Sequence, residues 1–478
     1  MDNLKEFVSK SKSMLIAPAG YGKTHTIVEC LKLVHSTNRQ LILTHTHAGV
    51  ASIKEKIKKE RIPSFWYNVE TITSFAQKYV LAFYRGPDLP NQDNKTYFPF
   101  VVSKAIEIFK KTPIINILKN SYSHLFVDEY QDCTTDQHSL ILALSEILPT
   151  HIFGDPLQGI FEFGGQSMTD LTSEEHMGDF LSNKYELSQP WRWKKHNRVN
   201  LGNDLKAIRA KLIDKQNINL RDFPSIELKI INDADLFKPS NSYSRGIWNL
   251  VEEPNLLLIH PDSTNISSRL KIISTYKNKF NIVEAIDDKD FYKLSQMIDV
   301  ITIETVGKVI RDVCLQIFNK TTINNWFNEN GVKNKTKENE RLIANLIKED
   351  IVSYKKSPRL YIIRNILNKI KKLPDIKCYR NELFRYLCMS IDEAEIQNMT
   401  VFDAMKTKRN SARRLGRKVG GKCIGTTLLT KGLEFDTVGI INAHRFKCPK
   451  NLYVALTRAT NRLIIFTNDP VLRPYGQP

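Results

Sequence analysis

The sequence lacks the signals of several common protein classes. Its seven cysteines include no Cys-x-x-Cys pair, which argues against a zinc or iron–sulfur site, and an odd, unpatterned set fits reduced thiols. The first ten residues, "MDNLKEFVSK", hold no apolar stretch of the kind that a signal peptide needs. No apolar run approaches the roughly 20 residues that span a bilayer. We therefore expect a cytoplasmic protein without a membrane segment.

The composition indicates a large folded protein with a polyanionic partner. The chain has 478 residues, of which 41% are hydrophobic, enough for the cores of roughly two to four domains. Its formal net charge is +19. An excess of that size is typical of proteins that bind nucleic acid, although a generally basic surface is the alternative.

Short apolar strands alternate with helices in the first third of the chain. This pattern occurs at residues 13–24, 40–60 and 124–147, and residues 150–158 add a further strand. Such alternation predicts a parallel sheet with helices on both faces. Because ligands of these sheets bind at the carboxyl ends of the strands, the polar clusters that follow each strand are candidate sites.

The segment "APAGYGKT" fits the phosphate-binding loop of P-loop nucleotide-binding proteins. Its glycines let the backbone curl so that successive N–H groups face phosphate oxygens, and the following helix adds the positive end of its dipole. We expect Lys23 to reach the β- and γ-phosphates and Thr24 to ligate Mg²⁺. A chance Gly-Lys-Thr turn is the alternative, and the flanking strand and helix argue against it. The predicted nucleotide-binding residues of this loop are Ala17, Pro18, Ala19, Gly20, Tyr21, Gly22, Lys23 and Thr24.

The segment "LFVDEYQD" places three carboxylates directly after a buried strand. Uncompensated buried acids are expensive, so a cation must face them. Asp128 ends a strand that we expect to lie beside the phosphate loop, where it can hold Mg²⁺. Glu129 can activate the attacking water. A role in capping the next helix is the alternative, which explains Asp132 as an acid of the first helical turn but does not explain the other two carboxylates.

Five blocks of the sequence together resemble the UvrD/Rep/PcrA-type superfamily 1 DNA helicases. "DEYQD" resembles motif II, because few other ATPases carry Gln after the aromatic residue. The other blocks follow in the family order. They are "GDPLQGIF" at 154–161 (motif III), "QPWR" at 189–192 (motif IV), "GTTLLTKGLEFD" at 425–436 (motif V) and "NLYVALTRATNRLIIF" at 451–466 (motif VI).

This resemblance implies a fold and a set of ATP-site roles. The fold class is α/β, with two RecA-like P-loop motor domains, each a parallel sheet flanked by helices, and small, mainly helical insertions. ATP and Mg²⁺ are the implied cofactors. Gln158 would sense the γ-phosphate, Arg458 would be the arginine finger and Arg192 a second cation on the same phosphate. Trp191 would stack on the base and Glu434 would lie near the ribose.

The same resemblance predicts the residues that contact DNA. Phe161, Phe163 and His45 match stacking positions, and stacking on aromatics tolerates any sequence. Thr71 and Ser74 match a motif that contacts the backbone. A polar-loop histidine without a ligand is an equally good interpretation of His45, and Trp193 fits either a core or a stacking role.

We predict four domains in the chain. Residues 1–80 and 121–195 form the first motor domain, and 81–120 a small accessory insertion. Residues 196–307 and 420–478 form the second motor domain, with strands at 255–261 and 300–307. A basic helical insertion occupies 308–419. Residues 351–420 hold 17 Lys/Arg against 6 Asp/Glu, a net charge of +11, and Arg413, Arg414 and Arg417 lie in their densest part. This charge predicts a phosphate track for DNA, with a solvated helix face as the alternative.

The sequence departs from the family at several positions. No Gln precedes the phosphate loop to recognise adenine, Leu428 replaces the motif V His, and Gly164 replaces the motif III Arg. These changes indicate weaker or differently regulated coupling between DNA and the ATP site.

Two functions therefore remain open. The first is a single-stranded-DNA translocase or helicase, with 3′→5′ polarity implied by the resemblance. The second is a regulatory ATPase subunit that senses single-stranded DNA or DNA ends and activates a partner nuclease. The short form and motif V are similar to UvrD-like helicase subunits of bacterial phage-defence systems such as Gabija, where the partner is an OLD-type nuclease. A P-loop protein that acts on RNA or free nucleotides is a third, less favoured interpretation.

Overall fold

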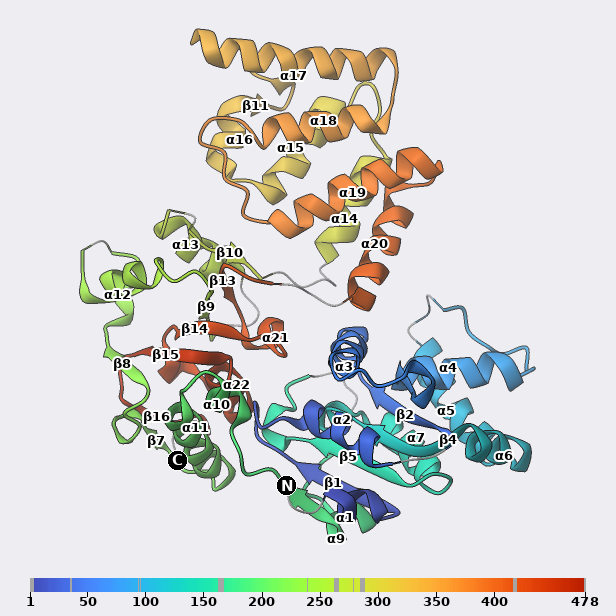
Figure 1. Ribbon diagram of the computed structural model, residues 1–478. Coiled ribbons are helices and arrows are strands. Elements are labelled where there is room, and N and C mark those ends of the chain that lie inside the picture. Colours follow the sequence, from blue (N-terminus) through green and yellow to red (C-terminus); the bar gives the residue numbers. More distant parts are fainter. Residues whose placement is uncertain are drawn as a thin grey trace. The chain divides into compact units, whose positions relative to one another are not determined.

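The fold is known from a computed structural model, drawn in Figure 1. The structure describes residues 4–476 apart from 35–36, 93, 95, 162–166, 239, 262–265, 278, 284–288 and 416–418, with only the backbone at 289–291 and 409–415. The chain divides into two compact units. One consists mainly of Met1–Asp233 and Lys431–Pro478, and the other mainly of Ala234–Arg413 and Val419–Thr430.

A six-stranded parallel sheet organises the amino-terminal part of the first unit. Its order is β3-β2-β4-β5-β1-β6. The strands are β1 (Lys12–Ile16), β2 (Arg39–Thr44), β3 (Tyr67–Thr71), β4 (Tyr122–Val127), β5 (Thr150–Gly154) and β6 (Lys184–Glu186). The helices are α1 (Leu4–Ser9), α2 (Lys23–Leu33), α3 (His47–Lys59), α4 (Ile72–Phe83), α5 (Tyr97–Phe109), α6 (Thr112–Ser121), α7 (Thr135–Ser145), α8 (Glu174–Met177) and α9 (Asp179–Ser182), with short 3-10 turns η1 (Ser64–Trp66), η2 (Tyr130–Asp132) and η3 (Pro156–Gln158).

One strand separates the phosphate-loop strand from the strand that precedes Asp128. We expected the latter strand to lie beside the phosphate loop; β5 lies between β1 and β4 in the sheet, while Asp128 Oδ2 lies 3.5 Å from Oγ1 of Thr24 directly after the loop. Chain order does not determine sheet order, because a parallel crossover can pass over the place that a later strand fills. Both β4 and β5 still end at the same edge of the sheet as β1, which keeps the polar clusters together.

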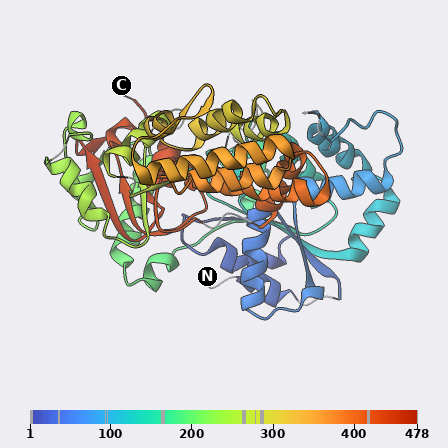
Figure 2. The same cartoon turned by 90° about the horizontal axis from the view of Figure 1, so that it is seen from above.

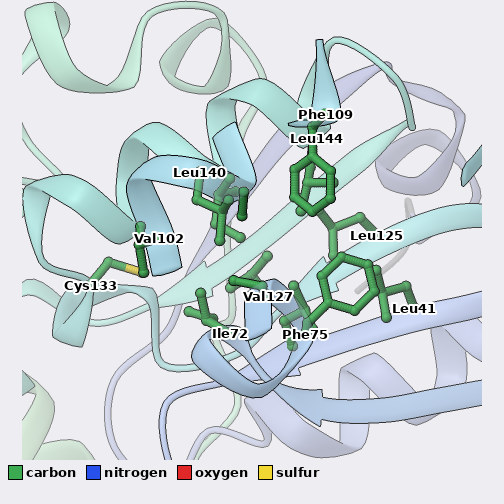
Figure 3. Packing of buried hydrophobic residues seen from close by; sticks show 14 of the residues in the cluster. Leu41, Ile72, Phe75, Val102, Phe109, Leu125, Val127, Cys133, Leu140 and Leu144 are labelled. Atoms are coloured by element: carbon green, nitrogen blue, oxygen red, sulfur yellow. The ribbon is translucent and has the colours of Figure 1, made fainter. Parts of the chain in front are cut away.

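The buried strands are apolar on both faces, as expected for a parallel sheet covered by helices. Leu41, Leu125 and Val127 point to the face that α4, α5 and α7 cover, where they meet Phe75 and Leu140 (Figure 3). Side chains that alternate with these point to the opposite face and meet α1, where Phe7 contacts Phe153. Helix α5, from the predicted small insertion, packs on α4 and α7 within this same core.

The remaining elements of the first unit come from two distant segments. They are α10 (Trp191–Lys195), α11 (Val199–Ile213), β7 (Ile218–Asn219), η4 (Leu220–Asp222), β8 (Glu227–Ile230), β14 (Phe435–Ile440), η6 (Ala443–Arg445), α22 (Pro449–Leu456), β15 (Ala459–Thr467) and β16 (Val471–Leu472). Strand β15 pairs in parallel with both β14 and β8, and Arg462 forms an ion pair with Glu227 across the second of these pairs.

The second sheet is also parallel and six-stranded, with the order β10-β13-β9-β14-β15-β8. The second unit supplies β9 (Leu256–Ile259), β10 (Asn281–Ile282) and β13 (Lys422–Gly425), with α12 (Ser242–Leu250), α13 (Ile266–Thr275) and α21 (Thr427–Thr430). The chain therefore has the predicted fold class, two parallel sheets flanked by helices.

A helical cluster forms the rest of the second unit. It contains α14 (Lys289–Asp299), α15 (Val306–Ile317), α16 (Lys320–Trp326), α17 (Glu338–Lys356), α18 (Leu360–Ile370), α19 (Asn381–Gln397) and α20 (Val401–Leu415), with the short hairpin β11 (Phe327–Asn328) and β12 (Gly331–Val332). Helices α17, α18 and α19 pack against one another in sequence, and Figures 1 and 2 show them side by side. Among the described residues, no helix has the length and apolar character needed to cross a membrane.

The strand predicted at 300–307 is wrong. The segment forms a turn, with Val300 and Ile303 exposed, and α15 begins at Val306. The backbone N–H of Thr302 donates to Oγ1 of Thr305 at 3.0 Å, and that of Thr305 donates to Oγ1 of Thr302 at 3.2 Å. These threonines satisfy backbone groups locally, which favours a turn before a helix over a strand.

Candidate functional site

The phosphate loop lies between β1 and α2 and has the backbone that its glycines allow. Gly20 and Gly22 have φ of 77° and 91°, in the region that favours glycine. A Cβ at Gly20 would also come within 2.9 Å of the Trp193 ring, so the loop has no room for one. Lys23 is buried, and its Nζ donates to the carbonyl of Ala17 at 3.2 Å. Its ammonium thus lies over the curled loop, as a phosphate-binding lysine requires.

Asp128 and Glu129 lie at the carboxyl end of β4, facing the start of α2. Thr24 Oγ1 lies 3.5 Å from Asp128 Oδ2, and Asp128 Oδ1 accepts the backbone N–H of Glu129 at 2.9 Å. Burial, together with the neighbouring Glu129, raises the pKa of Asp128 to about 6, against the pull of Lys23. A hydroxyl beside a carboxylate is the oxygen donor set that Mg²⁺ prefers.

Glu129 is held in an unusual backbone conformation, with φ of 54°. Non-glycine residues rarely adopt this region, and such strain is concentrated at functional sites. Burial alone would raise the pKa of Glu129, but Lys23, Lys431 and a hydrogen bond from Gln131 together hold it below its usual value. Glu129 is therefore an ionised carboxylate that can accept a proton.

Asp132 has a different environment from the one predicted. It closes η2, while α7 begins at Thr135 behind a capping box made by Thr134 and Gln137. The carboxylate of Asp132 instead accepts hydrogen bonds from Nζ of Lys431, at 2.6 Å to each oxygen. The interpretation of Asp132 as an acid of the following helix is wrong, because its charge is compensated by a residue that is remote in sequence.

Two arginines approach the same region from the later segments of the first unit. Arg458 is buried and donates to the carbonyls of Val454 and Leu433, at 2.8 and 3.2 Å. Arg192 donates to the carbonyl of Thr457 at 2.6 Å and to Glu434 at 2.7 Å. Burial, reinforced by the neighbouring Arg192 cation, lowers the pKa of Arg458 to about 10. A buried cation beside a second, partly buried one is costly, and a bound anion would relieve that cost.

The tryptophans of α10 have opposite environments. Trp191 is half-exposed and lies against the loop, with its ring 3.2 Å from where a Cβ of Gly22 would be. Trp193 is buried and donates its indole N–H to the carbonyl of Ala459 at 3.0 Å. The structure therefore decides the open question about Trp193 in favour of the core.

The chain is similar to known proteins in both of its halves. Residues 2–164 match the family described as "AAA domain", and residues 332–467 match the family described as "Viral superfamily 1 RNA helicase core domain". Gabija protein GajB from Bacillus cereus (strain VD045) is 25% identical over 393 residues, which cover 79% of this chain and 70% of that protein.

The chain is thus similar to an AAA domain in its first third, to a superfamily 1 helicase core domain in its last third, and to GajB over most of its length.

One solved structure is also similar to this chain, at a low level. It is the complex of arterivirus nonstructural protein 10 (helicase) with DNA, with a TM-score of 0.34 and 10% sequence identity. The match covers 97% of this chain, which spans 62% of the other.

The residues of this site fit a nucleotide with its metal ion. Arg192 Nε is a buried donor without a hydrogen-bond partner among the described residues, beside the loop that would hold phosphate. Lys23 and the loop N–H groups would hold the phosphates, and Thr24 and Asp128 would hold Mg²⁺, which neutralises phosphate charge when bound.

The predicted DNA contacts have the following places. His45 is half-buried, and its Nε2 lies 3.3 Å from Sγ of Cys133. Burial, with the nearby Lys431 cation, lowers the pKa of His45 to about 3. Thr71 caps α4 by accepting the N–H of Ser74 at 3.1 Å. Nζ of Lys431 lies 4.3 Å from the ring centroid of Phe161.

Four predicted DNA contacts cannot be placed by their side chains. Phe163 and Arg417 lie outside the described residues. Arg413 and Arg414 lie on α20, where only the backbone is described. Their roles stay predictions from the sequence.

Sequence reasoning missed three residues at the site: Lys431, which bonds Asp132; Tyr453, whose hydroxyl accepts the N–H of Ala19 in the phosphate loop; and Arg209, which bonds Asp155. Lys431 and Tyr453 stand inside the motif V and motif VI blocks, so their proximity to the site could have been anticipated. Arg209 stands in no motif, and nothing in the sequence distinguishes it from other helix arginines.

Proposed function

We propose that this chain is an ATP-driven translocase on single-stranded DNA that moves in the 3′→5′ direction. One observation carries the proposal: the phosphate loop, through the N–H of Ala19, donates to the hydroxyl of Tyr453 at 3.0 Å, on the helix that ends just before Arg458, and the charges of Lys23 and Arg458 both lower the pKa of Glu129. A general base between a phosphate-loop lysine and a second buried cation is the arrangement that phosphoryl transfer to water requires.

Each residue has a distinct task in this proposal. Lys23 binds the phosphates, Thr24 and Asp128 orient Mg²⁺, and Glu129 takes the proton of the attacking water. Arg458 and Arg192 stabilise the charge that develops on the transferred phosphoryl group, while Trp191 lies against the base. Gln158 is turned toward Asp155, with its Nε2 3.0 Å from Oδ2, and would sense the γ-phosphate from this position.

The DNA part of the proposal is supported by charge and by one aromatic contact. Residues 351–420 carry a net charge of +11, from 17 Lys/Arg and 6 Asp/Glu, which suits a phosphate track. Phe161 lies against Lys431, whose ammonium is bound to Asp132 beside Glu129. A base stacked on Phe161 would therefore act on a residue that already faces the ATP site.

A second function is favoured by a specific position. Leu428, where the family has the motif V His, is 44% exposed, so an apolar side chain replaces a polar one at that surface. Together with the similarity to Gabija protein GajB, this supports a regulatory ATPase of an antiviral defence complex. In that function, DNA or DNA ends would stimulate turnover, and the chain would activate a partner such as an OLD-type nuclease with little unwinding of its own.

Strand separation tests the two functions directly. The purified chain is mixed with ATP, Mg²⁺ and duplexes that carry either a 3′ or a 5′ single-stranded tail, with Glu129→Gln as the inactive control. The translocase proposal expects unwinding of the 3′-tailed duplex only. DNA-stimulated ATP turnover without unwinding of either duplex would favour the regulatory subunit. ATP turnover that is unaffected by DNA would refute both proposed functions.

A further inference from the structure

A fully buried carboxylate lies between the candidate ATP-site residues of the first sheet, such as Glu129, and those of the later segments, such as Arg458. Asp155 follows β5, and its side chain is 0% exposed. Its oxygens accept the backbone N–H of Leu157 at 3.3 Å and the amide of Gln158 at 3.0 Å. These bonds fix the turn η3, which presents Gln158.

The ion-pair partner of this carboxylate is Arg209, from the middle of α11. Nη2 and Nε of Arg209 lie 2.9 and 3.3 Å from Oδ1 of Asp155, and the arginine side chain is only 14% exposed. Two donors on one oxygen define the direction of the guanidinium as well as its distance. A carboxylate this deeply buried requires such a partner.

Hydrogen bonds lead from Asp155 to both sides of the ATP site. Its backbone N–H donates to Oε1 of Gln131 at 2.9 Å, and the amide nitrogen of Gln131 donates to Glu129. On the other side, Asp155 is hydrogen-bonded to Tyr453 of α22, whose hydroxyl accepts the N–H of Ala19 in the phosphate loop at 3.0 Å. The candidate base and the phosphate loop are thus linked through one carboxylate.

The segments that this network joins are those that the proposed motor must couple. Arg209 lies on α11, which packs against α10 and α22. Helix α10 carries Arg192, and α22 leads into Arg458. Glu129 and Gln158 lie in the loops that follow β4 and β5 of the first sheet. A shift of α11 would therefore move the charge that holds Asp155, and with it the two side chains nearest the γ-phosphate.

We propose that Arg209 is a positioning residue that sets the orientation of Gln158 and Glu129 through Asp155, an inference that rests on the ATPase function proposed above. It touches no substrate atom. We expect its effect on the rate of hydrolysis once nucleotide is bound, because Asp155 bonds Gln158 and Gln131 directly, whereas it reaches the phosphate loop only through Tyr453.

The experiment compares three variants of the full chain. Arg209→Met removes the ion pair while it keeps the apolar stem. Arg209→Lys keeps the charge but has no planar pair of donors. Lys206→Met removes one exposed charge from the same helix and serves as the matched control. The readouts are the stoichiometry and affinity of a fluorescent ATP analogue, and kcat and KM for DNA-stimulated hydrolysis.

The expected result is a split between binding and turnover. Arg209→Met should bind about one analogue per chain with an affinity within about threefold of wild type, while kcat per bound site falls at least about tenfold. Arg209→Lys should recover part of that loss, and Lys206→Met should behave like wild type.

Other results overturn the inference in distinguishable ways. A purely structural ion pair would lower the fraction of chains that bind nucleotide and leave kcat per bound site unchanged. If Arg209→Met does not fold, a fully active Arg209→Lys refutes the directional role. An active wild type with an unimpaired Arg209→Met refutes this inference alone, whereas a wild type that hydrolyses no ATP refutes the proposed function and the inference with it.

Discussion

Nζ of Lys431 lies 2.6 Å from both carboxylate oxygens of Asp132, a residue 299 positions earlier in the chain. The two side chains are 8% and 3% exposed, so the pair is buried. Burial raises the pKa of Asp132 to about 7 and lowers that of Lys431, while each charge opposes the shift of the other. The motif II and motif V blocks are therefore joined by an ion pair whose halves are costly when separated.

Removal of Lys431 alone should destabilise the chain. Lys431→Met leaves the Asp132 carboxylate buried without its cation, which costs about 3–5 kcal/mol for pairs of this kind. Asp132→Asn in the same chain should restore most of that stability, because the orphan charge is gone. Denaturant unfolding measures this, with the exposed Lys447→Met as control. A double variant as unstable as Lys431→Met would contradict the pairing argument.

Glu129→Gln should abolish hydrolysis and keep ATP binding. Glutamine matches the shape of the carboxylate but cannot accept the proton of water, so turnover should fall about 10²–10⁴-fold. Equilibrium binding of a fluorescent ATP analogue together with steady-state turnover checks both halves of this expectation. Turnover near that of wild type would remove Glu129 from its role as the base.

Arg458→Ala should slow hydrolysis strongly while nucleotide affinity stays largely intact. An arginine that stabilises developing charge is worth about 10³–10⁵ in rate in P-loop enzymes. Because Arg458 also bonds the carbonyls of Val454 and Leu433, thermal unfolding must accompany the kinetics. Arg445→Ala, on an exposed arginine of the same unit, is the control. An unchanged rate of ATP hydrolysis in folded Arg458→Ala protein would refute the role of Arg458 as an arginine finger.

Stability should fall as the solution is acidified below pH 6.5, partly because of His151. The hydroxyl of Ser13 donates to the carbonyl of Phe7, so Nδ1 of His151, at 2.7 Å from that hydroxyl, must donate to it. The remaining ring nitrogen, Nε2, is buried without a partner among the described residues. Burial, together with the stacked His124, lowers the pKa of His151 to about 3.

The sign of this effect follows from proton counts. Between about pH 6.5 and pH 3 the unfolded chain holds a proton on this histidine that the folded chain lacks. The free energy of unfolding therefore decreases as the pH is lowered through this range. From pH 7 to pH 5 the decrease should be about 2 kcal/mol for this group. Urea unfolding at both pH values, with His151→Gln alongside, measures it. An equal slope in both proteins would exclude His151 as the cause.

The basic segment should account for part of the salt dependence of DNA binding. Substitution of Gln for Arg413, Arg414 and Arg417 together should weaken the binding of single-stranded DNA. The slope of log affinity against log salt concentration should become smaller in magnitude by about 0.7 for each phosphate that is no longer neutralised. Changing the exposed Lys5, Lys111 and Lys119 to Gln removes the same charge elsewhere. If both triple variants shift the slope equally, the segment is only a solvated face.

Much of the nucleotide site was predictable because its chemistry is local. The backbone of the phosphate loop depends on glycines at 20 and 22, and Thr24 follows Lys23 directly. The position of Asp128 and Glu129 after an apolar strand likewise depends on neighbouring residues. The prediction failed where a short apolar pattern fits two local structures. At 300–307, threonine side chains accept the backbone N–H groups, and a turn forms in place of the expected strand.

The sequence by itself determined that two α/β sheets form and that phosphate-binding and carboxylate segments meet at strand ends, because periodicity and backbone chemistry act over a few residues. Only the tertiary structure decided that β5 lies between β1 and β4, that Trp193 is buried, that Lys431 neutralises Asp132 and that Arg209 holds Asp155. These partners are far apart in the chain, and they meet because the packing of whole sheets and helices leaves each buried charge one place where it can be compensated.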